Sequence, residues 1–287
     1  MLNNFESEKF ESKQEKEKNP KLMFVFDVDG IITNPDTKKP NEKVIEHISS
    51  DLKQGFPVAL ATGRSVAWVE EKIMPTLKTM LKDDRKLDYL LISGEKGSVS
   101  VEYIDGKPVK KIDKNIVMPA KITTEAKKII QPYLDSIFYD KSKETMISIE
   151  IKGSEDSEEV KKQKQMLILI AEQLKKIVQD SEFSEFLDVD LTEIAVDVQF
   201  KSQGKKLSSR HILGWLKGKN IKPSSYIVVG DSPSDVEAAE EFFHQDYDVT
   251  FGYVGTKDLP KQPFKTKTAS EFFDKGTVEI LDEIVQD

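Results

Sequence analysis

The sequence FDVDGII at residues 26–32 is the strongest local indication of the fold of this 287-residue chain. It continues the apolar run Met23–Phe26 (MFVF) into two aspartates and a glycine. A short, uninterrupted apolar run that ends in polar residues is typical of a strand buried on both faces of a parallel sheet. Because side chains alternate along a strand, Asp27 and Asp29 lie on one side and Val28 on the other. We therefore expect a buried strand that ends in a pair of neighbouring carboxylates.

Three further runs have the same character: Val58–Ala61 (VALA), Tyr89–Ile92 (YLLI) and Tyr226–Val229 (YIVV). Apolar residues at helical spacing lie between them, for example from Val44 to Leu52. Strands that alternate with helices indicate βαβ units. The sequence therefore predicts an α/β fold, with a mostly parallel sheet flanked by helices on both sides.

The middle of the chain has a different pattern. Glu144–Lys152 and Ile194–Phe200 alternate apolar and polar residues, as half-exposed antiparallel strands do, and Glu158–Val178 is a long charged stretch with helical periodicity. This predicts a second, α+β domain inserted into the first. We expect a charged, disordered tail at residues 1–19, a core formed by 20–104 and 199–287, and an inserted domain at 105–198.

Composition excludes several kinds of site. The chain has no cysteine, which removes disulfides, thiolate zinc sites and cysteine nucleophiles, and its three histidines are far apart. The net charge of −8 argues against a nucleic-acid partner. We see neither a run of the ~18 apolar residues that a membrane span needs nor a signal peptide, so we expect a cytoplasmic protein without a membrane partner.

Polar residues follow three of the apolar runs directly. Asp27 and Asp29 follow the first, Thr62 the second, and Asp231 and Asp235 the last. Ligands of open α/β sheets bind beyond the carboxyl ends of the strands, so we expect these side chains to meet. Carboxylates crowded together repel each other unless a cation lies between them, and oxygen ligands suit Mg²⁺. The sequence therefore predicts a Mg²⁺ site at this edge of the sheet.

Two neighbouring carboxylates can divide chemical work between them. One can stay ionised as a nucleophile that attacks phosphorus, while the other is held protonated as an acid. Taken alone, the DxDG pattern of Asp27 and Asp29 also fits turn or cap residues. The two polar motifs that follow it in order favour the catalytic interpretation.

The three motifs FDVDGII, LATGRS and VVGDSPSD together resemble those of the haloacid dehalogenase superfamily of phosphatases. An insertion between the second and third motifs resembles the Cof-type (class IIB) subgroup, which includes sugar-phosphate phosphatases. The resemblance implies a Rossmann-like core with an inserted cap domain. The chain departs from the family at Lys96, in a turn expected to face the site, and at Ser234, where many members have asparagine. These departures weaken any transfer of a particular member's substrate.

The resemblance also implies roles for individual residues. Asp27 would be the nucleophile and a Mg²⁺ ligand. Asp29 would protonate the leaving alcohol and later deprotonate water, with its backbone carbonyl touching the metal. Thr62 would bind a phosphoryl oxygen, Asp231 would be the second carboxylate ligand, and Asp235 would hold the metal's water shell or a lysine.

Further candidates surround the phosphate. The backbone amides of Gly30 and Gly63 lie where the resemblance expects phosphate contacts. Arg64 can pair with phosphate or sugar oxygens through two parallel hydrogen bonds, although a surface arginine in the first turn of a helix is an equally good interpretation.

The third-motif lysine has three candidates, Lys201, Lys205 and Lys206. The family's lysine usually opens a helix, with apolar residues about seven and eleven positions later. From Lys205 these positions hold Ile212 and Leu216, whereas from Lys206 one of them is a lysine. The spacing therefore favours Lys205.

The function that these observations favour is a Mg²⁺-dependent phosphomonoesterase with an aspartyl-phosphate intermediate. Its substrate would be a sugar phosphate or a similar small phosphorylated metabolite. A phosphomutase similar to phosphomannomutase is the enzyme alternative. Outside enzymes, the alternatives are a catalytically idle binding protein and a receiver-like phosphosignalling domain, although receivers are about half this length.

Overall fold

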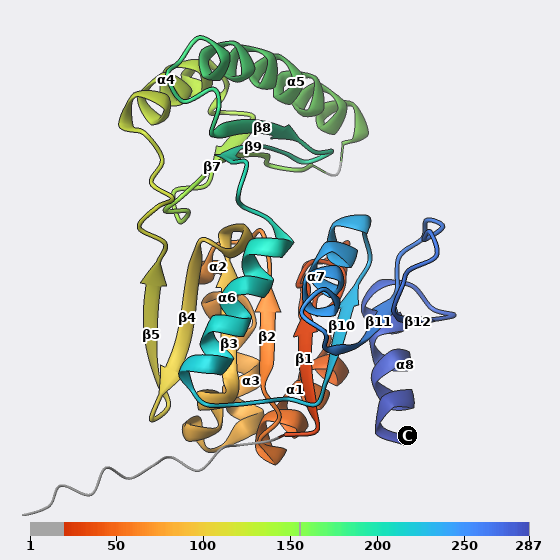
Figure 1. Cartoon of the computed structure of the whole chain (residues 1–287). Helices are drawn as coiled ribbons and strands as arrows, with labels where there is room; N and C mark the ends of the chain where they lie inside the picture. The colour runs from red at the N-terminus through yellow and green to blue at the C-terminus, as the bar shows by residue number, and fades with distance from the viewer. Residues whose placement is uncertain (1–19, 155, 287) are drawn as a thin grey trace, which may run out of the picture.

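The computed structural model describes residues 20–154 and 156–286 and contains two β-sheets (Figure 1). The large sheet has the order β12-β11-β10-β1-β2-β3-β4-β5. Its strands are β12 (Lys265–Thr268), β11 (Asp248–Tyr253), β10 (Ser225–Gly230), β1 (Leu22–Phe26), β2 (Val58–Ala61), β3 (Leu90–Gly94), β4 (Val99–Ile104) and β5 (Lys107–Ile112). The pairs from β12 to β3 are parallel, and the last two pairs are antiparallel. The tail expected at residues 1–19 lies outside the described residues.

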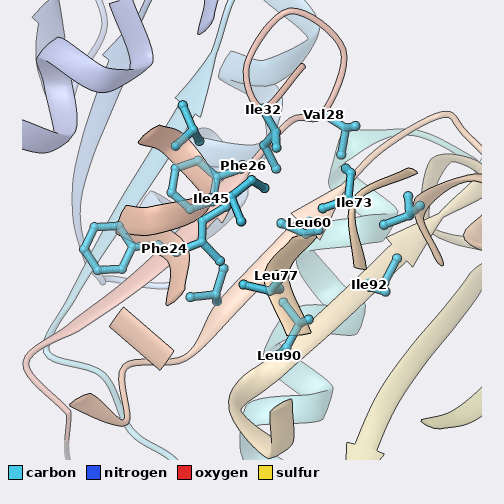
Figure 2. Close-up of a cluster of buried hydrophobic side chains, with 14 of the residues drawn as sticks. Phe24, Phe26, Val28, Ile32, Ile45, Leu60, Ile73, Leu77, Leu90 and Ile92 are labelled. Carbon is cyan, nitrogen blue, oxygen red and sulfur yellow. The ribbon is translucent and has the colours of Figure 1, made fainter. Parts of the chain in front are cut away.

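Strand β1 occupies the middle of this sheet and is buried on both faces. Phe24 and Phe26 belong to one apolar cluster, part of which Figure 2 shows, while Met23 and Val25 belong to a second cluster on the opposite face. Two buried faces explain why the run MFVF is apolar throughout rather than alternating. The predicted α/β fold with a mainly parallel sheet is confirmed.

Helices cover both faces of the large sheet. Apolar residues of α1 (Glu42–Gln54), α2 (Val66–Lys72), α3 (Met74–Leu81) and α8 (Phe273–Gln286) belong to the first cluster. Those of α6 (Lys205–Gly218) and α7 (Pro233–Phe243) belong to the second. Three short 3₁₀ helices complete the described helical segments, η1 (Asp84–Tyr89), η2 (Glu95–Gly97) and η3 (Gln131–Tyr133).

Local sequence sets where these helices begin and end. The side chain of Asn41 accepts a hydrogen bond from the amide of Lys43 and starts α1, which ends at Gly55 in a left-handed conformation with φ 84°. Helix α2 ends before Ile73, and α3 follows with Pro75 in its first turn, where a missing amide hydrogen costs nothing.

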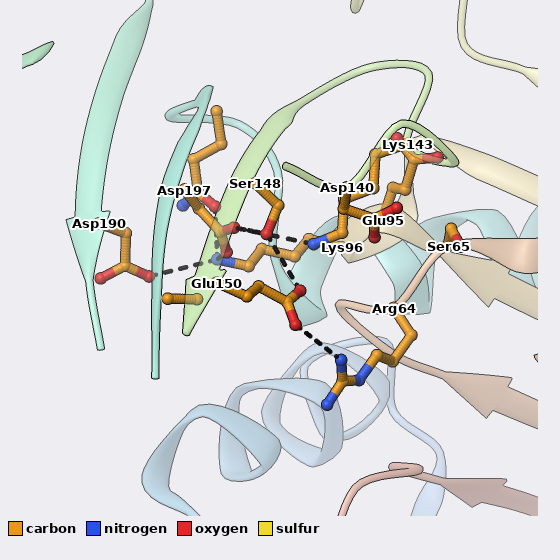
Figure 3. Close-up of polar contacts among 12 residues, drawn as sticks. Arg64, Ser65, Glu95, Lys96, Asp140, Lys143, Ser148, Glu150, Asp190 and Asp197 are labelled. Atoms are coloured by element: carbon orange, nitrogen blue, oxygen red, sulfur yellow. Dashed lines mark hydrogen bonds and ion pairs between the residues drawn. The ribbon is translucent and has the colours of Figure 1, made fainter. Parts of the chain in front are cut away.

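The small sheet is antiparallel and has the order β6-β7-β9-β8. Its strands are β6 (Ile137–Tyr139), β7 (Ile147–Ile151), β9 (Ala195–Phe200) and β8 (Leu187–Leu191). Helices α4 (Ala120–Ile130) and α5 (Ser157–Gln179) cover one face, and Ile147 and Ile149 pack into the apolar cluster beneath them. Because side chains alternate, Ser148 and Glu150 lie on the other face, toward the large sheet (Figures 1 and 3).

The strand pairing indicates that the inserted unit begins and ends later in the chain than we expect from the sequence. Strand β5 pairs with β4 in the large sheet, although residues 105–112 were expected to belong to the insertion. The small sheet ends with Phe200. We therefore propose 113–200 as the inserted unit. Among the described residues, no helix is both long and apolar enough to span a membrane.

Candidate active site

Three strand ends that lie side by side carry the candidate catalytic residues. Strand β1 pairs with β10 on one side and with β2 on the other, and all three run in the same direction. Asp27 extends the pairing by one step, since its amide donates to the carbonyl of Val229 at 3.1 Å. Carboxylate oxygens of Asp27, Asp231 and Asp235 lie within 4.8 Å of one another. We call these three residues the acidic cluster.

Lys205 reaches into the acidic cluster from the first turn of α6. Its ammonium nitrogen lies 2.6 Å from Oδ1 of Asp27 and 2.7 Å from Oδ1 of Asp235, and it donates to the carbonyl of Ala61 at 2.8 Å. The other candidate lysines, Lys201 and Lys206, are exposed. The structure therefore brings Lys205, the lysine favoured by the family's pattern, to Asp27.

Burial and the crowding of negative charge raise the pKa values of two aspartates in the cluster. Burial raises the pKa of Asp27 to about 7, because the attraction of Lys205 offsets that effect only in part and Asp235 adds repulsion. Burial, followed by repulsion from Asp235, raises the pKa of Asp231 to about 6. Burial disfavours the charged form of Lys205, but the two aspartates outweigh it and raise its pKa. A divalent cation between Asp27 and Asp231 would relieve this repulsion.

Asp235 has both carboxylate oxygens occupied by groups of this chain. Oδ1 contacts Lys205, and Oδ2 accepts from the amides of Asp231 and Ser232 and from the Ser232 hydroxyl at 2.8–3.1 Å. Asp235 thus holds the lysine and the loop after β10. This leaves Asp27 and Asp231 as the carboxylates that best fit direct contact with Mg²⁺, so the donor set suits a hard cation.

Gly30 lets the loop after β1 pass close to this cluster. Its φ is +77°, a left-handed conformation, and an added Cβ would lie 3.0 Å from Oδ2 of Asp231 and 3.2 Å from Cδ1 of Phe273. A side chain here would press against the carboxylate while straining the backbone. The requirement for glycine therefore has a steric cause in this structure.

Thr62 sits in a turn immediately after β2 and is 2% exposed. Its hydroxyl oxygen accepts from the amide of Arg64 at 3.1 Å, so its hydrogen remains available to a phosphoryl oxygen. The Thr62 amide donates to Ser93 and its carbonyl accepts from Lys96, which fixes the turn containing Gly63. This arrangement fits a phosphate-binding turn.

Arg64 joins Asp29 to the small sheet. Its Nε and Nη2 atoms each lie 3.0 Å from a carboxylate oxygen of Asp29, and Nη1 donates to Oε2 of Glu150 at 3.3 Å. Burial disfavours the charge of Arg64, yet its bonds and charge interactions with Asp29 and Glu150 raise its pKa. With a side chain 16% exposed, Arg64 is a bridging residue rather than a surface arginine.

The side chain of Asp29 faces this bridge. The acidic cluster contains oxygens of Asp27, Asp231 and Asp235, and Asp29 is instead held by Arg64. A contact of its backbone carbonyl with a metal stays a prediction. The two aspartates of the DxDG pattern thus have different partners, Lys205 for Asp27 and Arg64 for Asp29.

The turn between β3 and β4 makes two further contacts with the inserted unit (Figure 3). Lys96 pairs with Asp190 at 3.2 Å and with Asp197 at 3.1 Å. The neighbouring Glu95 carboxylate accepts from the amides of Glu144 and Thr145. The position of the Lys96 turn near the site was expected from the sequence, but none of these partners was.

Glu150 is the other residue that the sequence analysis missed. The alternation in Glu144–Lys152 could have placed it on the open face of its strand. It could not show which element that face would contact. Its contact with Arg64 spans 86 positions of the chain.

The α/β fold thus gathers three carboxylates and a lysine at one edge of its parallel sheet. Residues 24–242 match the model of a family described as haloacid dehalogenase-like hydrolase, and the chain belongs to this family. The expected superfamily and enzyme class are therefore confirmed.

Solved structures with similar folds have low sequence identity to this chain. The trehalose-6-phosphate phosphatase C-terminal domain of C. albicans is 14% identical with a TM-score of 0.62, covering 93% of each chain. A haloacid dehalogenase-like hydrolase from Bacteroides thetaiotaomicron is 14% identical with a TM-score of 0.59, covering 93% of this chain and 100% of that one. A Thermoplasma acidophilum protein is 17% identical with a TM-score of 0.58, covering 94% and 100%. These likenesses show the fold. No curated protein sequence matches the chain.

Proposed function

We propose that this protein is a Mg²⁺-dependent phosphomonoester hydrolase that forms an aspartyl-phosphate on Asp27. The substrate class is a sugar phosphate or a similar small phosphorylated metabolite. The observation that carries the proposal is the contact of Lys205 with Asp27 inside the acidic cluster, one strand away from Thr62. A buried carboxylate held by a cation beside a phosphate-binding turn suits nucleophilic attack on phosphorus.

The first step transfers the phosphoryl group to Asp27. A carboxylate oxygen of Asp27 forms a bond to phosphorus while the bond from phosphorus to the ester oxygen breaks. The leaving oxygen takes a proton from Asp29 and departs as an alcohol. Thr62 donates to a phosphoryl oxygen, and Lys205 balances the charge near Asp27. Mg²⁺ bound by Asp27 and Asp231 would neutralise further negative charge on the phosphoryl group.

The second step returns Asp27 to its starting state. A water oxygen attacks phosphorus, the bond between phosphorus and the Asp27 oxygen breaks, and Asp29 accepts the proton of the water. Asp29 is therefore required alternately as an acid and as a base. Because Arg64 occupies both of its oxygens in this structure, at least one of these contacts must yield when Asp29 carries a proton.

Hydrolysis of a generic aryl phosphate with added Mg²⁺ tests the proposal. We expect wild-type turnover, and a loss of roughly 10³-fold or more for Asp27→Asn, because the amide cannot act as the nucleophile. Asp36→Asn is the matched control, since Asp36 is exposed in the loop that follows the same strand. Absence of turnover by the wild type, or full turnover by Asp27→Asn, contradicts the proposal.

A further inference from the structure

The side chain of Lys96 runs from the turn η2 of the core to strands β8 and β9 of the small sheet (Figure 3). Resting on the proposed function, we propose that Lys96 is a positioning residue for the proton carrier Asp29. Lys96 fixes the small sheet so that Glu150 holds Arg64 against Asp29. Its effect on the reaction is therefore exerted through other residues.

The backbone of the turn is strained at Lys96. Its φ is 56° and its ψ 35°, and the preceding Glu95 has a φ of 48°. Lysine and glutamate adopt this left-handed region at a cost in free energy, whereas asparagine adopts it more readily. The backbone alone thus does not favour lysine here, and the contacts of the Lys96 side chain offset the cost.

The ammonium group of Lys96 lies against two carboxylates of the small sheet. Asp190 and Asp197 are directly opposite each other in β8 and β9, where like charges repel. Lys96 lies 3.2 Å from Asp190 and 3.1 Å from Asp197. Burial disfavours the charged form of Asp197, but the attraction of Lys143 and Lys96 outweighs it and lowers its pKa. A cation of the core therefore stabilises an ionised pair in the inserted unit.

The same face of the small sheet carries the link to Arg64. Ser148 of β7 is opposite Asp197 and donates to it at 2.6 Å. Its hydroxyl oxygen also lies 3.4 Å from Oε1 of Glu150, two positions further along β7. A hydroxyl group has one hydrogen, so its donation to Asp197 leaves Glu150 to accept from Arg64. The position of Asp197 is thus connected to the contact of Glu150 with Arg64.

Lys96 and Arg64 come from two turns that are bonded to each other. The amide of Lys96 donates to the carbonyl of Thr62 at 3.0 Å, and the amide of Glu95 donates to that of Arg64 at 2.9 Å. A Cβ added to Gly63 would lie 3.7 Å from Cγ and Cε of Lys96, so the aliphatic part of the lysine covers the phosphate-binding turn. Two neighbouring cations of the core therefore hold one face of the small sheet.

Loss of the Lys96 ammonium group leaves the inserted unit attached at Glu95 but frees the small sheet to shift. Glu150 then no longer fixes Arg64, and Asp29, with a side chain 35% exposed, loses a fixed partner. A displaced Asp29 slows the departure of leaving groups that need its proton. Phenol is such a leaving group, whereas dinitrophenolate departs without a proton.

The test measures kcat/KM of the full chain with Mg²⁺ for phenyl phosphate and for dinitrophenyl phosphate. This constant reports transfer to Asp27, the step in which the leaving group departs. For Lys96→Asn we expect a fall of about tenfold or more with phenyl phosphate and of less than about threefold with dinitrophenyl phosphate. An unfolded fraction of the protein lowers both values equally, so a structural loss alone cannot produce this difference.

Lys82→Asn is the matched control. Lys82 is exposed and also has a left-handed φ, of 61°, so the substitution relieves the same backbone strain away from the site. We expect the ratio of the two kcat/KM values to stay that of the wild type. Lys96→Met, which keeps the aliphatic part over Gly63, provides a second variant should Lys96→Asn fail to fold.

Glu150→Ala tests the route from Lys96 to Asp29. We expect it to produce the same selective loss with phenyl phosphate. Adding Lys96→Asn to it should lower kcat/KM by less than about twofold further, because both substitutions act on the position of Arg64.

Four results overturn the inference: unchanged constants in the Lys96 variants, equal losses with both esters, the selective loss in Lys82→Asn, or additive effects at Lys96 and Glu150. In those cases hydrolysis of the esters by the wild type still supports the proposed function. Absence of all turnover by the wild type overturns both.

Discussion

The ammonium nitrogen of Lys205 lies 2.6 Å from Oδ1 of Asp27, although 178 positions separate the two residues in the chain. The same nitrogen lies 2.7 Å from Asp235. One buried cation therefore offsets part of the repulsion between two carboxylates. It also joins α6, which follows the inserted unit, to the strand at the centre of the large sheet.

We expect Lys205→Met to abolish most activity and to lower stability. The loss of the cation leaves two buried carboxylates without their partner, which costs about 3–5 kcal/mol in comparable cases. Aryl phosphate turnover and urea unfolding at pH 7.5 measure the two effects. Lys206→Met is the matched control, because Lys206 is the next residue and is exposed. Loss of activity in the Lys206 variant with an active Lys205 variant would reassign the third-motif lysine.

Mg²⁺ is expected to stabilise the folded protein in the absence of substrate. Its binding offsets the negative charge crowded in the acidic cluster, and at ten times the dissociation constant it contributes about 1.4 kcal/mol. For a chain of this size that raises the melting temperature by about 2–3 °C.

Thermal unfolding with and without Mg²⁺ measures this shift. Asp231→Asn should lose most of it, whereas Asp246→Asn should keep it, because Asp246 is exposed and asparagine tolerates its left-handed φ of 61°. An equal Mg²⁺ shift in both variants would place the cation elsewhere.

We expect the buried side chain of Glu95 to make a large contribution to the free energy of unfolding. Its side chain is 0% exposed and accepts from the Thr145 hydroxyl at 2.7 Å and from the Thr145 amide at 2.8 Å. Replacement by alanine leaves these donors without an acceptor, so we expect a loss of about 2–4 kcal/mol in unfolding free energy. Urea denaturation measures it.

Glu144→Gln is the comparison for this loss. Glu144 pairs with Lys110 on the surface, with both side chains more than a third exposed, so its substitution should cost at most about 1 kcal/mol. Similar losses for the two variants would show that the Glu95 contacts do not hold the inserted unit to the core.

Asp51 is expected to make stability depend on pH. Burial raises its pKa from 3.8 to about 7 in the folded protein. The folded state therefore binds more protons than the unfolded state between about pH 4 and pH 7, and the contribution of Asp51 to stability falls as pH rises through this window. One pKa unit corresponds to ~1.4 kcal/mol, so the loss of unfolding free energy reaches at most about 4 kcal/mol.

Asp51→Asn removes this dependence. We expect the variant to be more stable than the wild type by a few kcal/mol at pH 8 and by only about 1 kcal/mol at pH 4.5, as measured by urea unfolding. Subtracting the unfolding free energy of one protein from that of the other removes the contribution of the other titrating groups. A constant difference from pH 4.5 to pH 8 would contradict a raised pKa of Asp51.

The sequence by itself predicts the large sheet and most of the candidate site. The run at Met23–Phe26 is apolar throughout because both faces of β1 are covered, and that requirement is visible in a few consecutive residues. Asp27, Thr62 and Asp231 follow parallel strands, whose carboxyl ends must share one edge of the sheet. The choice of Lys205 followed from the resemblance to the family, whose lysine opens a helix, and from the spacing of the apolar residues after it.

Only the tertiary structure decides how the two sheets meet. The contact of Arg64 with Glu150 and the buried position of Glu95, which accepts from Thr145, depend on residues far apart in the chain. The membership of β5 in the large sheet is instead local, because β5 pairs with the strand directly before it. Alternation could have placed Glu150 on the open face of its strand, but a period of two cannot say what that face will contact. That contact is set by the packing of the inserted unit against the core, to which the turn at Glu95 contributes. The carboxylates and the lysine were therefore predictable from local sequence, whereas the surroundings of the leaving group were not.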